Sequence, residues 1–180
     1  MGISYLNEKN VPTLCLVHGN ELLTKDHKRS QRVIQTLEKV STIVANSQFT
    51  VKLVKNLIPN KDNIKFVYPG AIDLNKVKSD SFVEINGSPV LITVARLEKR
   101  KGHKAILKAV KELTSDFPKI QYIITGEGPD KTHLQQLVKK YSLESNVIFT
   151  GLVNESQKKY LFEYVDLMVM PTLDEREKRS

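Results

Sequence analysis

The apolar residues of this chain fall into short runs rich in β-branched side chains, and most runs precede a segment with helical spacing of its apolar positions. The runs predict buried strands at residues 13–17, 41–45, 64–68, 90–94, 120–124 and 166–170, with a shorter one at 146–150. Helices are predicted around residues 33–40, 49–57, 106–117 and 134–141. Apolar strands that alternate with helices are typical of a parallel sheet covered on both faces. The pattern therefore predicts an α/β protein of the doubly wound type.

The alternation weakens between Tyr68 and Ser88, where glycine, proline, asparagine, serine and aspartate crowd together. Turn-forming residues without a sustained apolar period predict a linker at residues 69–88. The first part, residues 1–68, holds three predicted strands and two helices, which is little for an independent doubly wound domain. The second part, residues 89–180, stops just after a strand and ends in a charged and polar stretch. Both parts are therefore expected to be incomplete.

The composition is that of an ordinary soluble chain, with 40% hydrophobic residues, and it excludes disorder, collagen and disulfide scaffolds. The single cysteine, Cys15, cannot form an internal disulfide. No apolar run approaches the roughly 20 residues needed to cross a bilayer, and no signal peptide opens the chain, so a cytoplasmic protein is expected. The net charge of +8 calls for a reason, and anionic lipid, nucleic acid and phosphorylated ligands are the candidates.

In open α/β sheets, ligands bind outside the carboxyl ends of the strands, so the residues just after each predicted strand are the first candidates. Arg96 ends the strand at 90–94, and Lys101 with Gly102 opens the following helix. Free N–H groups and the helix dipole favour an anion there, and the fork of an arginine beside a mobile lysine suits a diphosphate. A solvated basic loop explains the same residues equally well, because further lysines and arginines surround them.

Gly126 and Gly128 follow the strand at 120–124, where they could let the backbone approach a ligand. The third glycine of a dinucleotide fingerprint is replaced by Lys131, which disfavours a Rossmann dehydrogenase, and no Walker-type phosphate loop occurs. A tight turn without a ligand is the simpler explanation of this glycine pair.

His18 follows the first strand, where its imidazole could bond a sugar hydroxyl or a phosphate, although a lone histidine is more often structural. The other histidines show no metal-ligand spacing with one another or with Cys15, so no metal site is predicted. A basic stripe at helical spacing suits either a solvated face or an anionic lipid surface. It consists of Lys25, Lys28, Arg29 and Arg32.

The ordered set of these junctions resembles the GT-B glycosyltransferases of glycosyltransferase family 4, which build polysaccharides and glycolipids from nucleotide sugars. The matching segments are Val17-His18-Gly19-Asn20-Glu21, Val44-Ala45-Asn46-Ser47, Val67 to Asp73, Val94-Ala95-Arg96-Leu97 with Lys101-Gly102, Thr125 to Pro129, Phe149-Thr150-Gly151 and Asp166 to Thr172. The resemblance implies two Rossmann-like doubly wound domains, both incomplete here. Residues 1–68 would be the end of the acceptor domain, 69–88 the interdomain linker, and 89–180 a truncated donor domain.

The resemblance also implies roles for individual residues. Arg96 and Lys101 match the pair that binds the donor diphosphate, and His18 matches the catalytic histidine near the transferred sugar. Gly126, Gly128 and Gly151 match backbone positions around the nucleotide. Such enzymes retain anomeric configuration and need neither a metal nor a cofactor besides the nucleotide-diphosphate sugar. The acceptor would be a saccharide or a lipid-linked glycan, reached from the cytoplasm with peripheral contact to the anionic inner face of a membrane.

The chain departs from the family pattern after Pro171 and Thr172, where two glutamates around a Gly-Phe-Gly should follow. Glu175 and Glu177 lack that Gly-Phe-Gly and receive no role. The sequence is thus interpreted as a fragment of a retaining hexosyltransferase with little or no activity of its own. The alternative is a non-catalytic nucleotide-binding or interaction module with the donor-domain fold. Nucleic-acid binding is disfavoured, because the aromatic residues are not interleaved with the basic stripe.

Overall fold

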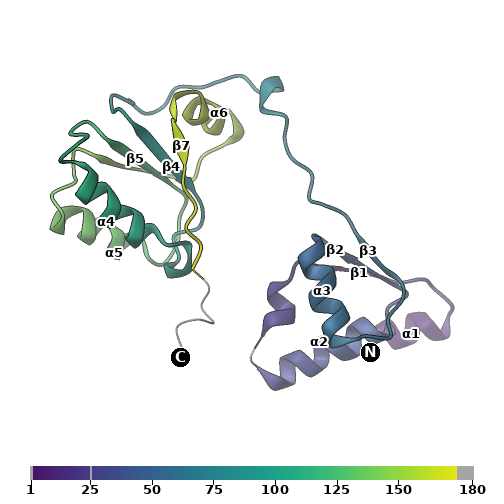
Figure 1. Ribbon diagram of the computed structural model, residues 1–180. Coiled ribbons are helices and arrows are strands. Elements are labelled where there is room, and N and C mark those ends of the chain that lie inside the picture. Colours follow the sequence, from purple (N-terminus) through teal and green to yellow (C-terminus); the bar gives the residue numbers. More distant parts are fainter. Residues whose placement is uncertain (1, 25, 174–180) are drawn as a thin grey trace. The chain divides into compact units, whose positions relative to one another are not determined.

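The computed structural model describes residues 2–24 and 26–173, and it divides into two compact units between Ile72 and Asp73. Each unit has its own parallel sheet with helices packed on it (Figure 1). The predicted α/β class is therefore confirmed. Within the described residues, no helix is both long enough and apolar enough to cross a membrane.

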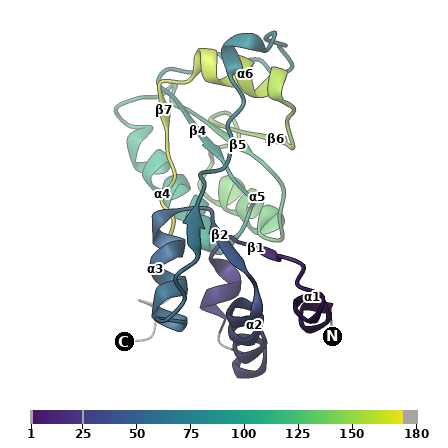
Figure 2. The same cartoon turned by 90° about the vertical axis from the view of Figure 1, so that its right-hand side faces the viewer.

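The first unit is a three-stranded sheet in the order β1-β2-β3. Its elements are α1 (Gly2–Glu8), β1 (Leu14–Val17), the 3-10 helix η1 (Asn20–Leu23), α2 (His27–Lys39), β2 (Thr42–Ala45), α3 (Gln48–Leu57) and β3 (Ile64–Phe66). The crossovers advance in one direction, and their right-handedness places α2 and α3 on the same face of the sheet (Figure 2). Both helices begin at side-chain caps, with Asp26 accepting from the amide of Arg29 and Ser47 from that of Thr50.

Only one face of this first sheet is covered in the part of the chain that the structure describes. Cys15 and Val17 of β1 point to the core formed with α2 and α3, whereas Leu14 and Leu16 are 66% and 53% exposed. The pattern of apolar strands predicts cover on both faces. The difference follows from the strand order, because two crossovers in the same direction leave the second face without a helix.

The second unit is a four-stranded parallel sheet in the order β6-β5-β4-β7. Its elements are the 3-10 helices η2 (Leu74–Lys76) and η3 (Lys99–Lys101), β4 (Val90–Val94), α4 (His103–Leu113), β5 (Gln121–Thr125), α5 (Lys131–Lys140), β6 (Val147–Gly151), α6 (Glu155–Tyr164) and β7 (Leu167–Met168). The chain steps outward from β4 to β6 and then returns past β4 to β7. Right-handed crossovers therefore put α4 and α5 on one face and α6 on the other. The reversal between β4 and β7 is a topological switch point, where ligands bind such sheets.

The face that carries α6 is also covered by part of the segment predicted as a linker at 69–88. Phe82, Val83 and Ile85 pack against the core that includes Leu161 of α6. Tyr160 Oη donates to the carbonyl of Val83 at 2.9 Å, so the segment is bonded to the helix beside it. The part of the segment around Phe82, Val83 and Ile85 is thus held on the second unit, because it buries an apolar sheet face.

Two helices were not predicted, and two strands, β3 and β7, end earlier than predicted. The pattern did not indicate α1 or α6, and Leu161 is the only fully buried residue of α6. A capping box starts α6, with Asn154 Oδ1 accepting from the amide of Gln157 and Gln157 Oε1 from that of Asn154. Strand β7 is shorter than the predicted 166–170, because its ladder with β4 spans only two residue pairs.

Candidate functional site

The loops that follow β4 and β7 meet at the switch point of the second sheet. The amide of Leu173 donates to the carbonyl of Arg100 at 2.8 Å. Gly102 adopts a left-handed conformation with φ of 73°, and a Cβ there would collide with the carbonyl oxygen of Pro171. Gly102 is also the N-cap of α4. The start of α4, with its unpaired N–H groups, therefore opens at this crevice.

Two predicted site residues, Arg96 and Lys101, lie in the loop between β4 and α4. The Arg96 side chain is 73% exposed and pairs with Glu98 at 3.1 Å, while the other carboxylate oxygen of Glu98 pairs with Arg100 at 2.8 Å. Among the described residues, Lys101 has no carboxylate within ion-pair distance. An exposed pair such as Arg96–Glu98 contributes little stability, so an incoming anion can compete for the guanidinium.

The two glycines after β5 let this loop approach the loop after β4. Gly126 has φ of 130°, and a Cβ there would collide with the carbonyl oxygen of Ala95. A Cβ on Gly128 would lie 2.7 Å from the nitrogen of Leu97. The two loops are bonded at the same place, since the amide of Leu97 donates to the carbonyl of Glu127 at 3.0 Å. Backbone packing alone thus requires both glycines, and their contact with a nucleotide stays a prediction.

Gly151 completes the same edge from β6. Its φ of 72° lies in the left-handed region, and its carbonyl accepts from the amide of Gly126 at 2.8 Å. A Cβ at Gly151 would lie 3.1 Å from the Glu127 carboxylate. The structure therefore brings Arg96, Lys101 and the three glycines to one edge of the second sheet.

A buried hydrogen-bond chain supports this edge from below. Thr93 Oγ1 donates to the carbonyl of Val169 at 2.7 Å, and Tyr122 Oη donates to Thr93 Oγ1 at 2.9 Å. Because the proton of Tyr122 is used in this way, Tyr122 must accept from His103 Nδ1, which lies 3.2 Å away. The His103 side chain is 1% exposed, and its Nε2 has no partner in the described part of the chain. His103 is therefore a neutral imidazole with its proton on Nδ1.

The environment of His103 predicts a pH-dependent stability. Burial lowers the pKa of His103 from its ordinary value of 6.5 and outweighs the opposing effects of the Arg96 backbone and Asp130, while the charge of Lys101 adds a smaller lowering. Below pH 6.5 the unfolded chain therefore binds a proton that the folded chain resists, so the free energy of unfolding falls as the pH falls. One such group contributes at most about 1.4 kcal/mol per pH unit.

Urea denaturation between pH 7.5 and 5 measures this effect. We expect His103→Gln to make the loss of unfolding free energy on acidification shallower than in the unaltered chain. His27→Gln, which removes an exposed imidazole at the start of α2, is the matched control and should leave the slope unchanged. Equal slopes for His103→Gln and the unaltered chain would contradict the assignment.

His18 lies in the first unit, directly after β1, and is exposed. Its amide donates to Glu21 Oε1 at 2.6 Å. Partial burial acts to raise the pKa of the Glu21 carboxyl, but hydrogen bonds from the backbone of Glu21, His18 and Gly19 outweigh it, so this pKa lies below its ordinary value. The carboxylate therefore stays ionised and holds the turn that presents the imidazole.

Asn46, which belongs to one of the matching segments but received no role from the sequence, is a neighbour of His18. Its Oδ1 accepts from Thr50 Oγ1 at 2.8 Å, which directs its amide nitrogen toward His18. That nitrogen lies 3.4 Å from the carbonyl oxygen of His18 and 3.5 Å from His18 Nδ1. A donor facing Nδ1 favours the tautomer with the proton on Nε2, which leaves an N–H for a ligand. Asn46 could have been found from the sequence, because it is a polar residue directly after the strand that neighbours β1.

The other residues considered in the sequence are the basic stripe and the two C-terminal glutamates. Lys28, Arg29 and Arg32 are exposed on α2, while Lys25, Glu175 and Glu177 lie outside the described residues. No three histidine, cysteine, aspartate or glutamate side chains gather as a metal site within residues 2–24 and 26–173. His18 belongs to the first unit, and the other predicted site residues belong to the second.

Two units, each with a parallel sheet, match the GT-B fold of solved glycosyltransferase structures. The chain belongs to the family of glycosyl transferases group 1, whose model matches residues 75–177, more than half of the chain. The predicted family is thus confirmed.

Sequence similarity to known proteins extends over most of this chain. It is 20% identical to 2-deoxystreptamine glucosyltransferase of Streptomyces kanamyceticus over 82% of its length, and 24% identical to alpha-monoglucosyldiacylglycerol synthase of Streptococcus pneumoniae over 72%. The matches cover only 38% and 30% of those relatives. The fold matches the Anabaena protein HepE, solved in complex with UDP and glucose, with a TM-score of 0.76 and 18% identity, over 95% of this chain and 49% of that one.

Proposed function

We propose that this chain is part of a retaining glycosyltransferase that transfers a sugar from a nucleotide-diphosphate sugar to a saccharide or lipid-linked acceptor. The observation that carries the proposal is the placement of Arg96 and Lys101 beside the start of α4, at the switch point of the second sheet. Two cations and a helix N-terminus stabilise the negative charge that builds on a departing nucleoside diphosphate. Membership of the group 1 family supports this, as do UDP and glucose in the HepE structure.

In this proposal the chain needs no metal or further cofactor, because Arg96 and Lys101 supply the positive charge. His18 faces the transferred sugar, and its Nε2–H donates to a hydroxyl or phosphate oxygen. The names of two relatives, 2-deoxystreptamine glucosyltransferase and alpha-monoglucosyldiacylglycerol synthase, support transfer of a glucosyl group to a small hydroxylated molecule or to a lipid. For a lipid-linked acceptor, the basic face of α2 would meet the anionic cytoplasmic face of a membrane.

Titration of the chain with UDP and with GDP, followed by amide chemical shifts, tests the proposal. We expect saturable shifts in residues 95–102 and 126–130, and little or no consumption of the corresponding glucose and mannose donors by the chain alone. Saturable shifts confined to other residues, or none with either nucleotide, would overturn the donor site. Tight binding to another protein or to lipid, unaffected by nucleotide, would favour a non-catalytic interaction module instead.

A further inference from the structure

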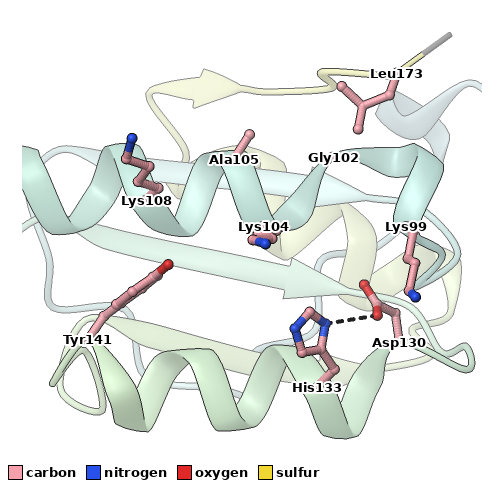
Figure 3. A pocket seen from close by; sticks show the side chains of 9 residues that line it. All are labelled: Lys99, Gly102, Lys104, Ala105, Lys108, Asp130, His133, Tyr141 and Leu173. Carbon is pink, nitrogen blue, oxygen red and sulfur yellow. Dashed lines mark hydrogen bonds and ion pairs between the residues drawn. The ribbon is translucent and has the colours of Figure 1, made fainter. Parts of the chain in front are cut away.

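A cavity of about 380 Å³ lies between α4 and α5, on the face of the second sheet that these two helices cover. Lys99, Lys104 and Lys108 line it from the side of η3 and α4, with the Lys108 side chain directed away from α5, and Asp130, His133 and Tyr141 line it from the side of α5 (Figure 3). We call this cavity the α4–α5 groove. Its volume lies within the range of small-molecule sites. Gly102 and Leu173 border it at the switch point, but the proposed transfer reaction gives no role to Lys104, Lys108, His133 or Tyr141.

One wall of the α4–α5 groove carries a surplus of positive charge. Among the described residues, Lys99 and Lys104 have no carboxylate within ion-pair distance, and Lys108 has only a 3.9 Å contact with the exposed Glu112. The acidic side chain opposite, Asp130, is 7% exposed and lies 3.1 Å from His133 Nδ1, the interaction drawn in Figure 3. The lysines are therefore available to an anion, whereas the carboxylate already has a partner.

The cations extend along α4 farther than one phosphate group can reach. Lys104, Lys108 and Lys111 follow one another at spacings of four and three residues, which places them on one face of the helix. At 1.5 Å per residue, Lys104 and Lys111 stand about 10 Å apart along the helix axis. Lys111 Nζ lies 5.1 Å from the ring centroid of Tyr141, so the row ends against an aromatic side chain of the groove.

We propose that the α4–α5 groove binds an anionic carbohydrate that carries two phosphate or similarly acidic groups about 10 Å apart. The lysine row meets the two acidic groups, and the ring of Tyr141 with the His133–Asp130 pair meets the sugar between them. The choice of a carbohydrate rests on the proposed saccharide acceptor, whereas the need for two separated anions rests on the lysine row alone. A concave site between two helices fits such a molecule better than it fits the plane of a membrane.

Amide chemical shifts of the whole chain, titrated with a hexose bisphosphate, test this proposal. We expect saturable shifts in residues 103–108 and 131–141, outside those expected to respond to UDP, and binding at least about 10-fold tighter than that of inorganic phosphate, because two charge-assisted contacts replace one. The double variant Lys104→Gln/Lys108→Gln should lose about 10-fold or more in affinity. The matched control Lys52→Gln/Lys55→Gln removes two exposed charges from α3 of the first unit and should stay within about two-fold.

Four results would overturn the proposal: no saturable shift, equal affinity for inorganic phosphate, equal loss in both double variants, or vesicle binding without bisphosphate binding. In the fourth result, anionic phospholipid vesicles bind through Lys104 and Lys108, whereas the hexose bisphosphate does not bind. UDP titration of the unaltered chain separates this proposal from the proposed function. UDP binding without bisphosphate binding would overturn only the proposal for the α4–α5 groove. Bisphosphate binding without UDP binding would overturn only the proposed donor site.

Discussion

Replacing Arg96 by alanine is expected to weaken the binding of UDP by about 10- to 100-fold, because a hydrogen bond to a charged group contributes about 1.5–3 kcal/mol. The guanidinium is exposed at the switch point, and its one ion pair within the described part of the chain is the surface contact with Glu98, so it can turn to a diphosphate at little cost. Lys101→Ala should have a similar effect. The losses of the double variant should not add in full, because both side chains would act on one diphosphate.

Isothermal titration of the whole chain with UDP measures these changes. Arg100→Ala is the matched control, since it removes one positive charge from the same loop and the same carboxylate, Glu98. The affinity of Arg100→Ala for UDP should stay within about two-fold of that of the unaltered chain. The affinity of Arg96→Lys for UDP should lie between those of Arg96→Ala and the unaltered chain, because lysine keeps the charge but loses the bidentate geometry of arginine. Equal losses for Arg96→Ala and Arg100→Ala would favour the solvated basic loop that the sequence also allowed.

The strands, four of the helices and the start of α4 could be predicted because each follows from local periodicity or from a single glycine. The same holds for Arg96 and Lys101, which stand directly after a strand and before a helix. Helix α6 could not be found by periodicity, since Leu161 alone of its residues is fully buried. The approach of Asn46 to His18 depends on the register of β1 and β2, which pairs Val17 with Ala45. Sequence spacing does not contain that register.

The glycines after β5 show a second limit of sequence reasoning. A Gly-x-Gly turn looks the same whether a ligand or another backbone segment needs the space of the missing Cβ. The neighbours that decide the matter, Ala95 and Leu97, belong to a different loop, so only the folded chain reveals them. The buried chain from His103 through Tyr122 to Thr93 likewise joins three elements and is invisible to local patterns.

Gly126→Ala is expected to destabilise the chain by about 2–5 kcal/mol. A φ of 130° costs any residue with a side chain about 1–3 kcal/mol, and the Cβ would also collide with the carbonyl oxygen of Ala95. The collision pushes on the residue before Arg96, so the variant should lose affinity for UDP as well as stability. Urea denaturation followed by circular dichroism measures the first effect, and titration with UDP measures the second.

Gly70→Ala provides the comparison that makes this result interpretable. A Cβ at Gly70 meets nothing within 4 Å, and its φ lies outside the left-handed region, so alanine there should change stability by less than about 1 kcal/mol. If both variants unfold at the same urea concentration, the close approach of the β4 and β5 loops is not what Gly126 provides. If Gly126→Ala loses stability but keeps its affinity for UDP, the loop contact stabilises the fold without positioning Arg96.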